Sequence, residues 1–368
     1  MALDLFTLDF LAKNTSLPIP HVHASSCSLD NPLSRPYTLM PCLEGTPLGN
    51  LWFDPVWMTD QRRQRVFESL ALAMSQLSSF TFPKIGDLVP DPETGCATIG
   101  PIYPSTEEIS DEGATSEDAL GPYDSTYDFL LDGIRRQSEC ANSCLAQLTL
   151  LRVFASSLPD DSYTSPPFVL AFPDYNYDNI LVDGEGHVTG LLDWDSTFVG
   201  PRQVGFAHYP SWITRDWDPT CYVWHPRDVE SPLDDPSVDL APGGDGPCND
   251  DLDIGGRARN SEQDGGHSEI GRVPEGSPQT LQRYRDEYLE IYAKVDPENA
   301  VFTKNSRILE AVQIGVFSEV SRGGIVQKLA EYMFGAGDTL LSMGLMECLE
   351  QGAWLKDLVG AKKLVSST

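Results

Sequence analysis

The stretch that most limits how this chain folds is residues 168–195. It begins with a short apolar run, continues as a polar loop, and ends in two apolar segments separated by Asp-Gly at 183–184. An Asp-Gly pair between two apolar segments is a strong signal for a β-hairpin. The sequence therefore predicts a strand that ends near Phe172, a loop that reaches Asn179, and a hairpin whose second strand ends at Asp193.

Counting along this hairpin brings polar side chains to one of its ends. In an antiparallel hairpin that turns near residue 185, residue 179 lies opposite about residue 191. Asp193 then lies just beyond the same open end as Asn179, and the loop that carries Asp174 leaves from that end too. We therefore expect one amide oxygen and at least two carboxylates to converge there.

Oxygen ligands of this kind suit Mg²⁺, which keeps waters and takes further oxygens from phosphates. The spacing D-x-x-x-x-N, followed by a hairpin and an Asp, is the layout of kinase-like phosphoryl-transfer enzymes. In the alternative interpretation, Asp174, Asn179 and Asp193 are turn and strand-end residues that satisfy backbone groups. The sequence L-L-D-W at 191–194, placed directly after the hairpin, favours the first interpretation.

Apolar periodicity and breaker residues predict the elements around this hairpin. Helices are expected at 3–12, 60–78, 125–154, from 277 onward, at 306–334 and at 338–359. Short strands are expected at 20–24 and 37–43, and the Pro- and Gly-rich residues 82–103 are typical of a hairpin or an irregular flap.

Residues 228–276 differ in composition from the rest of the chain. Between Asp228 and Glu275 there are 13 acidic and three basic residues, with many Gly, Pro and Ser and almost no aromatic residues. Such a segment cannot bury enough apolar surface to offset the entropy lost on ordering. We predict a disordered acidic insertion, which is a candidate site for a protein partner.

The overall charge excludes several function classes. The chain has 25 Lys and Arg against 55 Asp and Glu, a formal net charge of −30. An excess of Lys and Arg is needed to neutralise phosphates, so neither nucleic acid nor an anionic membrane surface is an expected partner. The sequence has no apolar run of membrane-spanning length and no basic signal region at Met1, and its eight scattered cysteines predict reduced thiols. A cytoplasmic protein is expected.

Residues 168–195 and four further segments resemble a known family. These segments are 14–22 (NTSLPIPHV), 37–48 (YTLMPCLEGTPL), 80–101 with its KIGD and IGP sequences, and 199–202 (VGPR). Together they resemble the aminoglycoside phosphotransferase/choline kinase-like family, in the form common in fungi. The resemblance extends over most of the chain from residue 4 to about residue 334, apart from the acidic segment.

The resemblance implies an α+β, protein-kinase-like fold with a truncated small N-terminal lobe (N-lobe) and a mainly helical C-terminal lobe (C-lobe). The expected regions are a residual N-lobe and hinge at 1–45, the C-lobe with the catalytic hairpin at 46–227, the insertion at 228–276, and the C-terminal helices of the C-lobe at 277–368. It also implies transfer of the γ-phosphate of ATP to the hydroxyl of a small molecule. Separately, the negative charge of the chain suggests an acidic acceptor cleft, which would favour a cationic acceptor such as an amino sugar or amino alcohol.

The resemblance assigns roles to individual residues of this chain. Asp174 is the expected catalytic base, and Asn179 and Asp193 are the expected Mg²⁺ ligands, with Asp195 as an assisting residue. The adenine of ATP is expected to meet backbone groups of the hinge at Met40, Pro41, Cys42 and Leu43.

The sequence departs from the family pattern at several positions. Phe172 stands where the family usually has His, and Pro41 in the hinge has no N–H group. The chain begins at the first helix, with Asp4 in place of the family's Glu, so neither a Gly-rich loop nor a Lys-bearing strand precedes it. We expect either an incomplete version of a longer protein or a degenerate family member. Two functions follow: a small-molecule kinase, or a catalytically inactive pseudokinase that acts as a binding protein.

Overall fold

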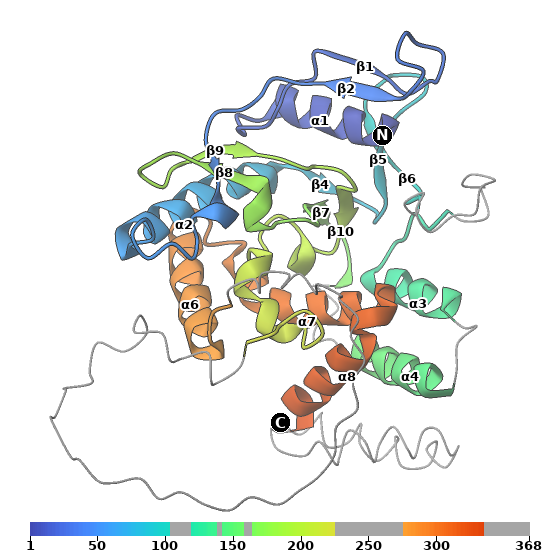
Figure 1. The fold of residues 1–368 in the computed structure, drawn as a ribbon. Coiled ribbons are helices and arrows are strands. Elements are labelled where there is room, and N and C mark those ends of the chain that lie inside the picture. The colour runs from blue at the N-terminus through green and yellow to red at the C-terminus, as the bar shows by residue number, and fades with distance from the viewer. Residues whose placement is uncertain (104–118, 138–141, 158–163, 225–274, 335–368) are drawn as a thin grey trace, which may run out of the picture.

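The computed structural model describes residues 1–103, 119–137, 142–157, 164–224 and 275–334, which combine helices with small antiparallel sheets (Figure 1). The helices are α1 (Ala2–Asn14), α2 (Asp60–Ser75), α3 (Thr126–Arg136), α4 (Asn142–Ser156), α6 (Pro278–Val295), α7 (Ala300–Phe317) and α8 (Glu319–Phe334). The strands are β1 (Ala24–Ser26), β2 (Tyr37–Leu39), β3 (Thr46–Pro47), β4 (Thr81–Phe82), β5 (Asp87–Pro90), β6 (Ala97–Gly100), β7 (Phe168–Ala171), β8 (Ile180–Val182), β9 (Val188–Leu191) and β10 (Phe198–Gly200).

Two of the sheets are built from the segment that the sequence singles out. Strand β7 lies between β10 and β4, and β8 lies between β3 and β9, with every pair antiparallel. Ile180 is paired with Leu191, and the N–H of Leu192 donates to the carbonyl of Asn179 at 2.8 Å. The predicted hairpin is therefore confirmed. Asn179 lies opposite residue 192, one position beyond the residue 191 that counting predicted.

The tip of this hairpin follows from its residue types. The carboxylate of Asp183 accepts the N–H groups of Glu185 and His187, at 2.8 and 2.9 Å. Gly186 has φ +92°, a conformation that side chains rarely adopt, and a Cβ there would lie 2.9 Å from the carbonyl oxygen of Arg62 in α2. The turn thus combines an Asp that binds backbone groups with a Gly that permits the close approach of α2.

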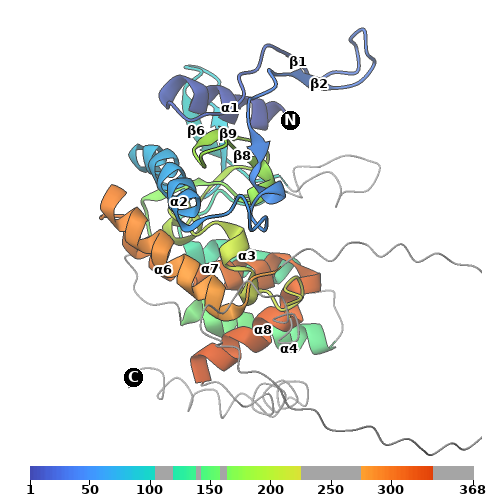
Figure 2. The same ribbon diagram turned by 60° about the vertical axis from the view of Figure 1, so that its left-hand side comes forward.

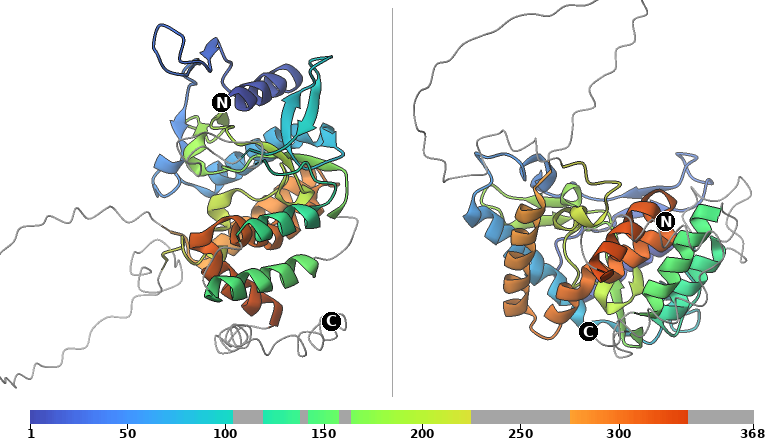
Figure 3. Two further views of the ribbon diagram at one scale, coloured as in Figure 1. Left: turned by 90° about the vertical axis from the view of Figure 1, so that its right-hand side faces the viewer. Right: turned by 90° about the horizontal axis from the view of Figure 1, so that it is seen from below.

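The helices are divided between the two ends of the molecule. Figures 1 and 2 show α1 and the projecting β1–β2 hairpin at one end, and α3, α4, α7 and α8 gathered at the other. Helix α6 packs against α2 along one side, and α7 contacts α8, α3 and α4. Figure 3 shows these helices covering the sheets from below. The core between them contains many rings, including Trp212 and Trp217, which are 2% and 8% exposed.

Several sequence predictions need correction. The helix expected at 125–154 is two helices, α3 and α4, and the one expected at 306–334 is likewise α7 and α8. The second break occurs because the Arg322 guanidinium donates to the carbonyls of Gly315 and Val316, at 2.9 and 3.3 Å, while Ser318 accepts the N–H of Ser321 and so caps α8.

The strand predictions near the N-terminus are also wrong in their limits. β1 begins only at Ala24, and β2 ends at Leu39 rather than at residue 43. The hairpin expected at 82–103 is confirmed as β5 and β6. Cys144 is in a disulfide bond, against the expectation of free thiols, whereas Cys27, Cys42, Cys96 and Cys221 are free and exposed.

Two predicted segments lie outside the described residues: nearly all of the acidic insertion at 228–276, and the helix at 338–359. Within the part of the chain that the structure describes, no helix is both long enough and apolar enough to cross a membrane.

Candidate active site

The loop between β7 and β8 carries the expected base. It leaves the sheet at Phe172, exposes the side chain of Asp174, and enters β8 through a 3₁₀ turn at Tyr177–Asn179. The amide nitrogen Nδ2 of Asn179 donates to Oδ2 of Asp174 at 2.7 Å and to its carbonyl at 3.2 Å. The structure thus brings Asp174 and Asn179 into direct contact and fixes which way the amide of Asn179 faces.

The loop that follows β9, which we call the metal loop, consists of Asp193, Trp194, Asp195 and Ser196. Asp193 and Ser196 have φ values of +55° and +60°, in the left-handed region that residues other than Gly rarely occupy. The side chain of Trp194 between them is buried, and its indole N–H donates to the carbonyl of Leu191 at 3.1 Å. As a result the residues on either side of Trp194, Asp193 and Asp195, stay exposed at the surface.

Backbone pairing links these two loops. The hydrogen bond from Leu192 to Asn179 lies one residue before Asp193. The N–H of Leu191 donates to the carbonyl of Pro18 at 2.8 Å, which joins β9 to the segment after α1. Asp174, Asn179 and Asp193 are therefore held at the same end of the β8–β9 hairpin, as the sequence predicts.

Helix α1 contributes a carboxylate to the metal loop. Oδ1 of Asp4 accepts the N–H of Ser196 at 3.1 Å. Partial burial raises the pKa of Asp195, and the negative charges of Asp4 and Asp193 raise it further. Asp195 thus faces other carboxylates, whereas Asp174 faces the amide of Asn179.

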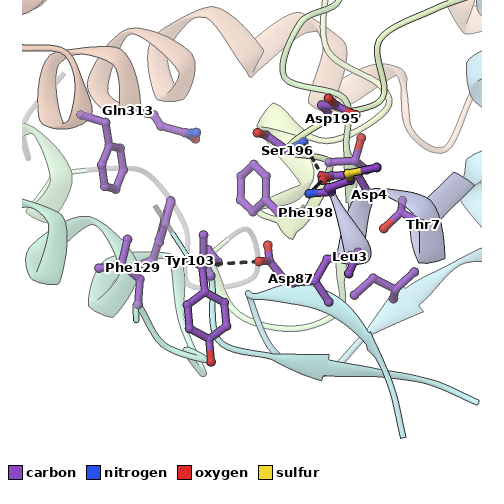
Figure 4. A pocket seen from close by; sticks show the side chains of 17 residues that line it. Leu3, Asp4, Thr7, Asp87, Tyr103, Phe129, Asp195, Ser196, Phe198 and Gln313 are labelled. Carbon is purple, nitrogen blue, oxygen red and sulfur yellow. Dashed lines mark hydrogen bonds and ion pairs between the residues drawn. The ribbon is translucent and has the colours of Figure 1, made fainter. Parts of the chain in front are cut away.

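Beside the metal loop is a cavity of about 640 Å³, shown in Figure 4. Its lining includes the carboxylates of Asp4, Asp87 and Asp195 and the rings of Phe129 and Phe198, but neither Asp174 nor Asn179. Burial raises the pKa of Asp87 to about 6, and the nearby charge of Asp4 adds to this effect. The cavity is acidic on one side and apolar on the other.

The expected hinge is less enclosed. Residues 40–43 follow the end of β2, and 40% of Met40 is exposed. Leu43 packs against β9, where a Cβ at Gly190 would lie 3.1 Å from Leu43 Cδ1, and the hydroxyl of Thr189 donates to the carbonyl of Glu44 at 2.6 Å. The hinge is thus joined to the strand that leads into the metal loop.

The donor set at the hairpin end fits a Mg²⁺–phosphate complex better than an isolated metal site. Among the described residues, no three His, Cys, Asp or Glu side chains gather as metal ligands. Asn179 and Asp193 supply one amide and one carboxylate group, and Mg²⁺ is usually held by only one or two carboxylates together with phosphates and waters. Because Nδ2 of Asn179 is bonded to Asp174, its Oδ1 is the atom that remains for a cation.

The sequence prediction missed one contact of this site. The rings of Phe172 and Trp194 stack with centroids 4.4 Å apart and an interplanar angle of 21°. Each is 1% exposed. The only signal in the sequence was that each aromatic residue lies within two positions of a candidate acidic residue.

A loop with an Asp and an Asn five residues apart, then an antiparallel hairpin, then a loop with a further Asp, is the order in which kinase-like enzymes carry the base and the metal ligands. The sequence model of the phosphotransferase enzyme family, APH, matches residues 6–227. The chain therefore belongs to this family, and the expected α+β, kinase-like fold is confirmed.

The relatives that match are distant. A protein described as a subtelomeric hrmA-associated cluster protein, in two strains of Aspergillus fumigatus, is 24% identical over 277 residues, which cover 58% of this chain. They cover 53% of the relative, so the chain spans about half the length of these curated relatives.

Solved structures also match. Macrolide 2′-phosphotransferase type I matches with a TM-score of 0.43 and 12% identity, over 92% of this chain and 79% of its own. Macrolide 2′-phosphotransferase MphH from Brachybacterium faecium matches with a TM-score of 0.40 and 14% identity, over 89% of this chain and 79% of its own. The GDP complex of aminoglycoside 2′-phosphotransferase-IIIa matches with a TM-score of 0.39 and 12% identity, over 96% of this chain and 82% of its own.

Proposed function

We propose that this chain transfers the γ-phosphate of ATP to a hydroxyl group of a small molecule. The observation that carries the proposal is the direct contact between Asp174 and Asn179, together with the backbone bond that ties Asn179 to the residue before Asp193. Membership of the phosphotransferase family supports the reaction class.

Asp174 is the proposed base. The acceptor oxygen forms a bond to the γ-phosphorus, the bond from that phosphorus to the β–γ bridging oxygen breaks, and ADP leaves with the electron pair. The proton of the acceptor hydroxyl passes to the carboxylate of Asp174, whose direction is set by the amide of Asn179.

Asn179 and Asp193 are the proposed ligands of Mg²⁺, with Asp195 in an assisting role. When bound, Mg²⁺ neutralises charge on the phosphate oxygens. The left-handed backbone of Asp193 and the buried Trp194 hold the Asp193 carboxylate at the surface for this purpose. Backbone groups of residues 40–43 are the proposed contacts of the adenine, since the hinge lies against β9.

A cationic acceptor is the proposed substrate class. Three carboxylates line the cavity beside the metal loop. The amino group of Met1 already pairs with Asp4, so Asp87 and Asp195 are the carboxylates that remain, and no Lys or Arg side chain is among the described lining residues. Carboxylates in a partly apolar cavity attract a positive charge more strongly than they would in open water.

The test is phosphoryl transfer to a panel of amino sugars and amino alcohols, read out as ADP release and as ³¹P signals of new phosphate esters. Asp174→Asn should reduce kcat by roughly 10²- to 10⁴-fold, the usual contribution of a positioned base. Asp178→Asn is the matched control, because Asp178 is an exposed Asp in the same loop and is given no role in the reaction.

If the wild-type chain is active and Asp174→Asn retains full kcat, the assignment of the base is wrong. If folded wild-type chain phosphorylates no member of the panel and also binds no MgATP, the enzyme proposal fails, and the binding-protein function expected from the sequence takes its place.

A further inference from the structure

Phe172 lies in the first position after β7, two residues before Asp174. Trp194 lies between Asp193 and Asp195. Their rings stack at 4.4 Å and 21°, and Phe172 also contacts the ring of Tyr175 with centroids 5.8 Å apart. One side-chain contact therefore joins the loop that carries the proposed base to the loop that carries the proposed metal ligand.

The backbone around Trp194 is strained. The left-handed conformation places Cβ too close to the carbonyl oxygen. Asp193 tolerates it better than most residues, whereas Ser196 adopts it only where the surroundings enforce it. The enforcing contacts are visible: the indole N–H bonds to Leu191, the hydroxyl of Thr197 bonds to the carbonyl of Trp194 at 2.8 Å, and the ring stacks on Phe172. The first two are local to this segment. The stack is the contact that reaches the loop between β7 and β8, which carries Asp174.

We propose that Phe172 and Trp194 are positioning residues that act as a pair. The stack holds Trp194 in the core, and the buried Trp194 holds Asp193 in its left-handed conformation, at the hairpin end that also carries Asn179 and Asp174. The catalytic consequence of this inference rests on the proposed function, whereas its structural consequence does not.

The stack also involves the position at which the family usually has His, two residues before the proposed base Asp174. Here that position is Phe172, and its ring takes over the bracing of the loop. Phe172 has no polar atom with which to hold the loop through a hydrogen bond. A buried ring offers instead a large contact area and a preferred offset-stacked geometry, which restricts how the two loops move against each other.

The experiment compares Phe172→Leu with Phe67→Leu. Phe67 is the matched control, since it is also a fully buried ring, located in α2 and packed on Tyr288 of α6 with centroids 5.4 Å apart. The measurement is amide hydrogen exchange at Leu192, Ser196 and Thr197, whose N–H groups bond to Asn179, Asp4 and Trp194. This measurement needs neither ATP nor an acceptor.

Phe172→Leu should raise exchange at these three amides by roughly two- to tenfold more than Phe67→Leu does, because only the first variant removes the stacking contribution at the metal loop. Equal exchange in the two variants would overturn the proposal. The wild type provides a check that needs no variant. Its three amides should exchange as slowly as the amide of Phe206, which bonds to Leu170 of β7. Exchange of the three at the rate of an exposed loop would also overturn the proposal.

A functional measurement separates this proposal from the previous one. In a wild type that binds MgATP, Phe172→Leu and Trp194→Leu should weaken MgATP binding and lower kcat, with KM for the acceptor unchanged. Trp194→Phe keeps a ring and should retain most of the MgATP affinity and most of kcat. Unchanged values in the Leu variants would contradict the positioning role. A wild type that binds no MgATP would count against the proposed function but not against the positioning role. Hydrogen exchange would still decide whether the stack holds the metal loop.

Discussion

The two regions proposed to hold ATP are built in different ways. On the side of Asp174 and Asp193, β7 and β8 are buried at every position. On the side of the hinge, β2 has no buried residue, and 57% of Leu39 is exposed. Side-chain packing therefore fixes the geometry of the proposed catalytic groups, whereas the hinge is placed mainly through its backbone and its contact with β9.

This contrast agrees with what each region is proposed to do. Groups that bind a metal or move a proton have to be held within a fraction of an ångström of their working positions. A strand that meets a planar base through backbone atoms does not depend on its own side chains to the same degree.

The largest expected effect is on stability. Leu170 of β7 is 0% exposed, so Leu170→Ala should lower the free energy of unfolding by about 2–5 kcal/mol, measured by urea denaturation. Leu39→Ala makes the same change in the exposed β2 and should alter it by less than about 0.5 kcal/mol. Similar losses in both variants would remove the contrast between the two regions.

The next effect depends on pH and tests the wall of the cavity. Burial raises the pKa of Asp87 to about 6, above its ordinary value of 3.8. Between about pH 4 and pH 6 the folded state therefore binds more protons at this site than the unfolded state, and its contribution to stability falls as pH rises.

Asp87→Asn removes that dependence. Relative to the wild type, the variant should gain about 1–3 kcal/mol in free energy of unfolding between pH 4 and pH 7, from the usual conversion of a pKa shift. Denaturation curves of both proteins at the two pH values give this quantity. A difference between variant and wild type that stays constant with pH would show that Asp87 is not desolvated.

The smallest expected effect concerns strain in the metal loop. Ser196 has φ +60°, which Gly adopts without steric cost, so Ser196→Gly should raise the free energy of unfolding by about 0.5–1 kcal/mol. Ser69→Gly, within α2, should lower it by a similar amount. Thermal unfolding of the two variants compares them directly, and a loss of stability in Ser196→Gly would argue against strain at this position.

The parts of the fold that were predictable from sequence depend on local signals. The Asp-Gly turn and apolar strands placed the β8–β9 hairpin to within one residue, and Ser277 before Pro278 marked the start of α6, where Ser277 Oγ accepts the N–H of Thr280. The missed features depend on contacts between distant residues. Apolar periodicity continues through the α7–α8 break, which the buried Arg322 guanidinium stabilises.

The candidate site divides in the same way. The positions of Asp174, Asn179 and Asp193 followed from spacing, because a hairpin brings its two ends together. The stack of Phe172 on Trp194 could not be predicted, since nothing in an alternating apolar pattern says which buried ring meets which. The sequence did not indicate which residues form the acidic cavity for the same reason: Asp4, Asp87 and Asp195 come from three separate segments.

The central claim is that the packed half of the site holds a metal–nucleotide complex, and calorimetry of MgATP binding tests it most directly. Three proteins are compared: the wild type, Asp193→Asn, which tolerates a left-handed backbone, and Cys42→Ser in the hinge. We expect the wild type to bind MgATP, Asp193→Asn to bind about tenfold or more weakly, and Cys42→Ser to change the affinity by less than about twofold. No binding by folded wild type, or equal binding by Asp193→Asn, would contradict the central claim.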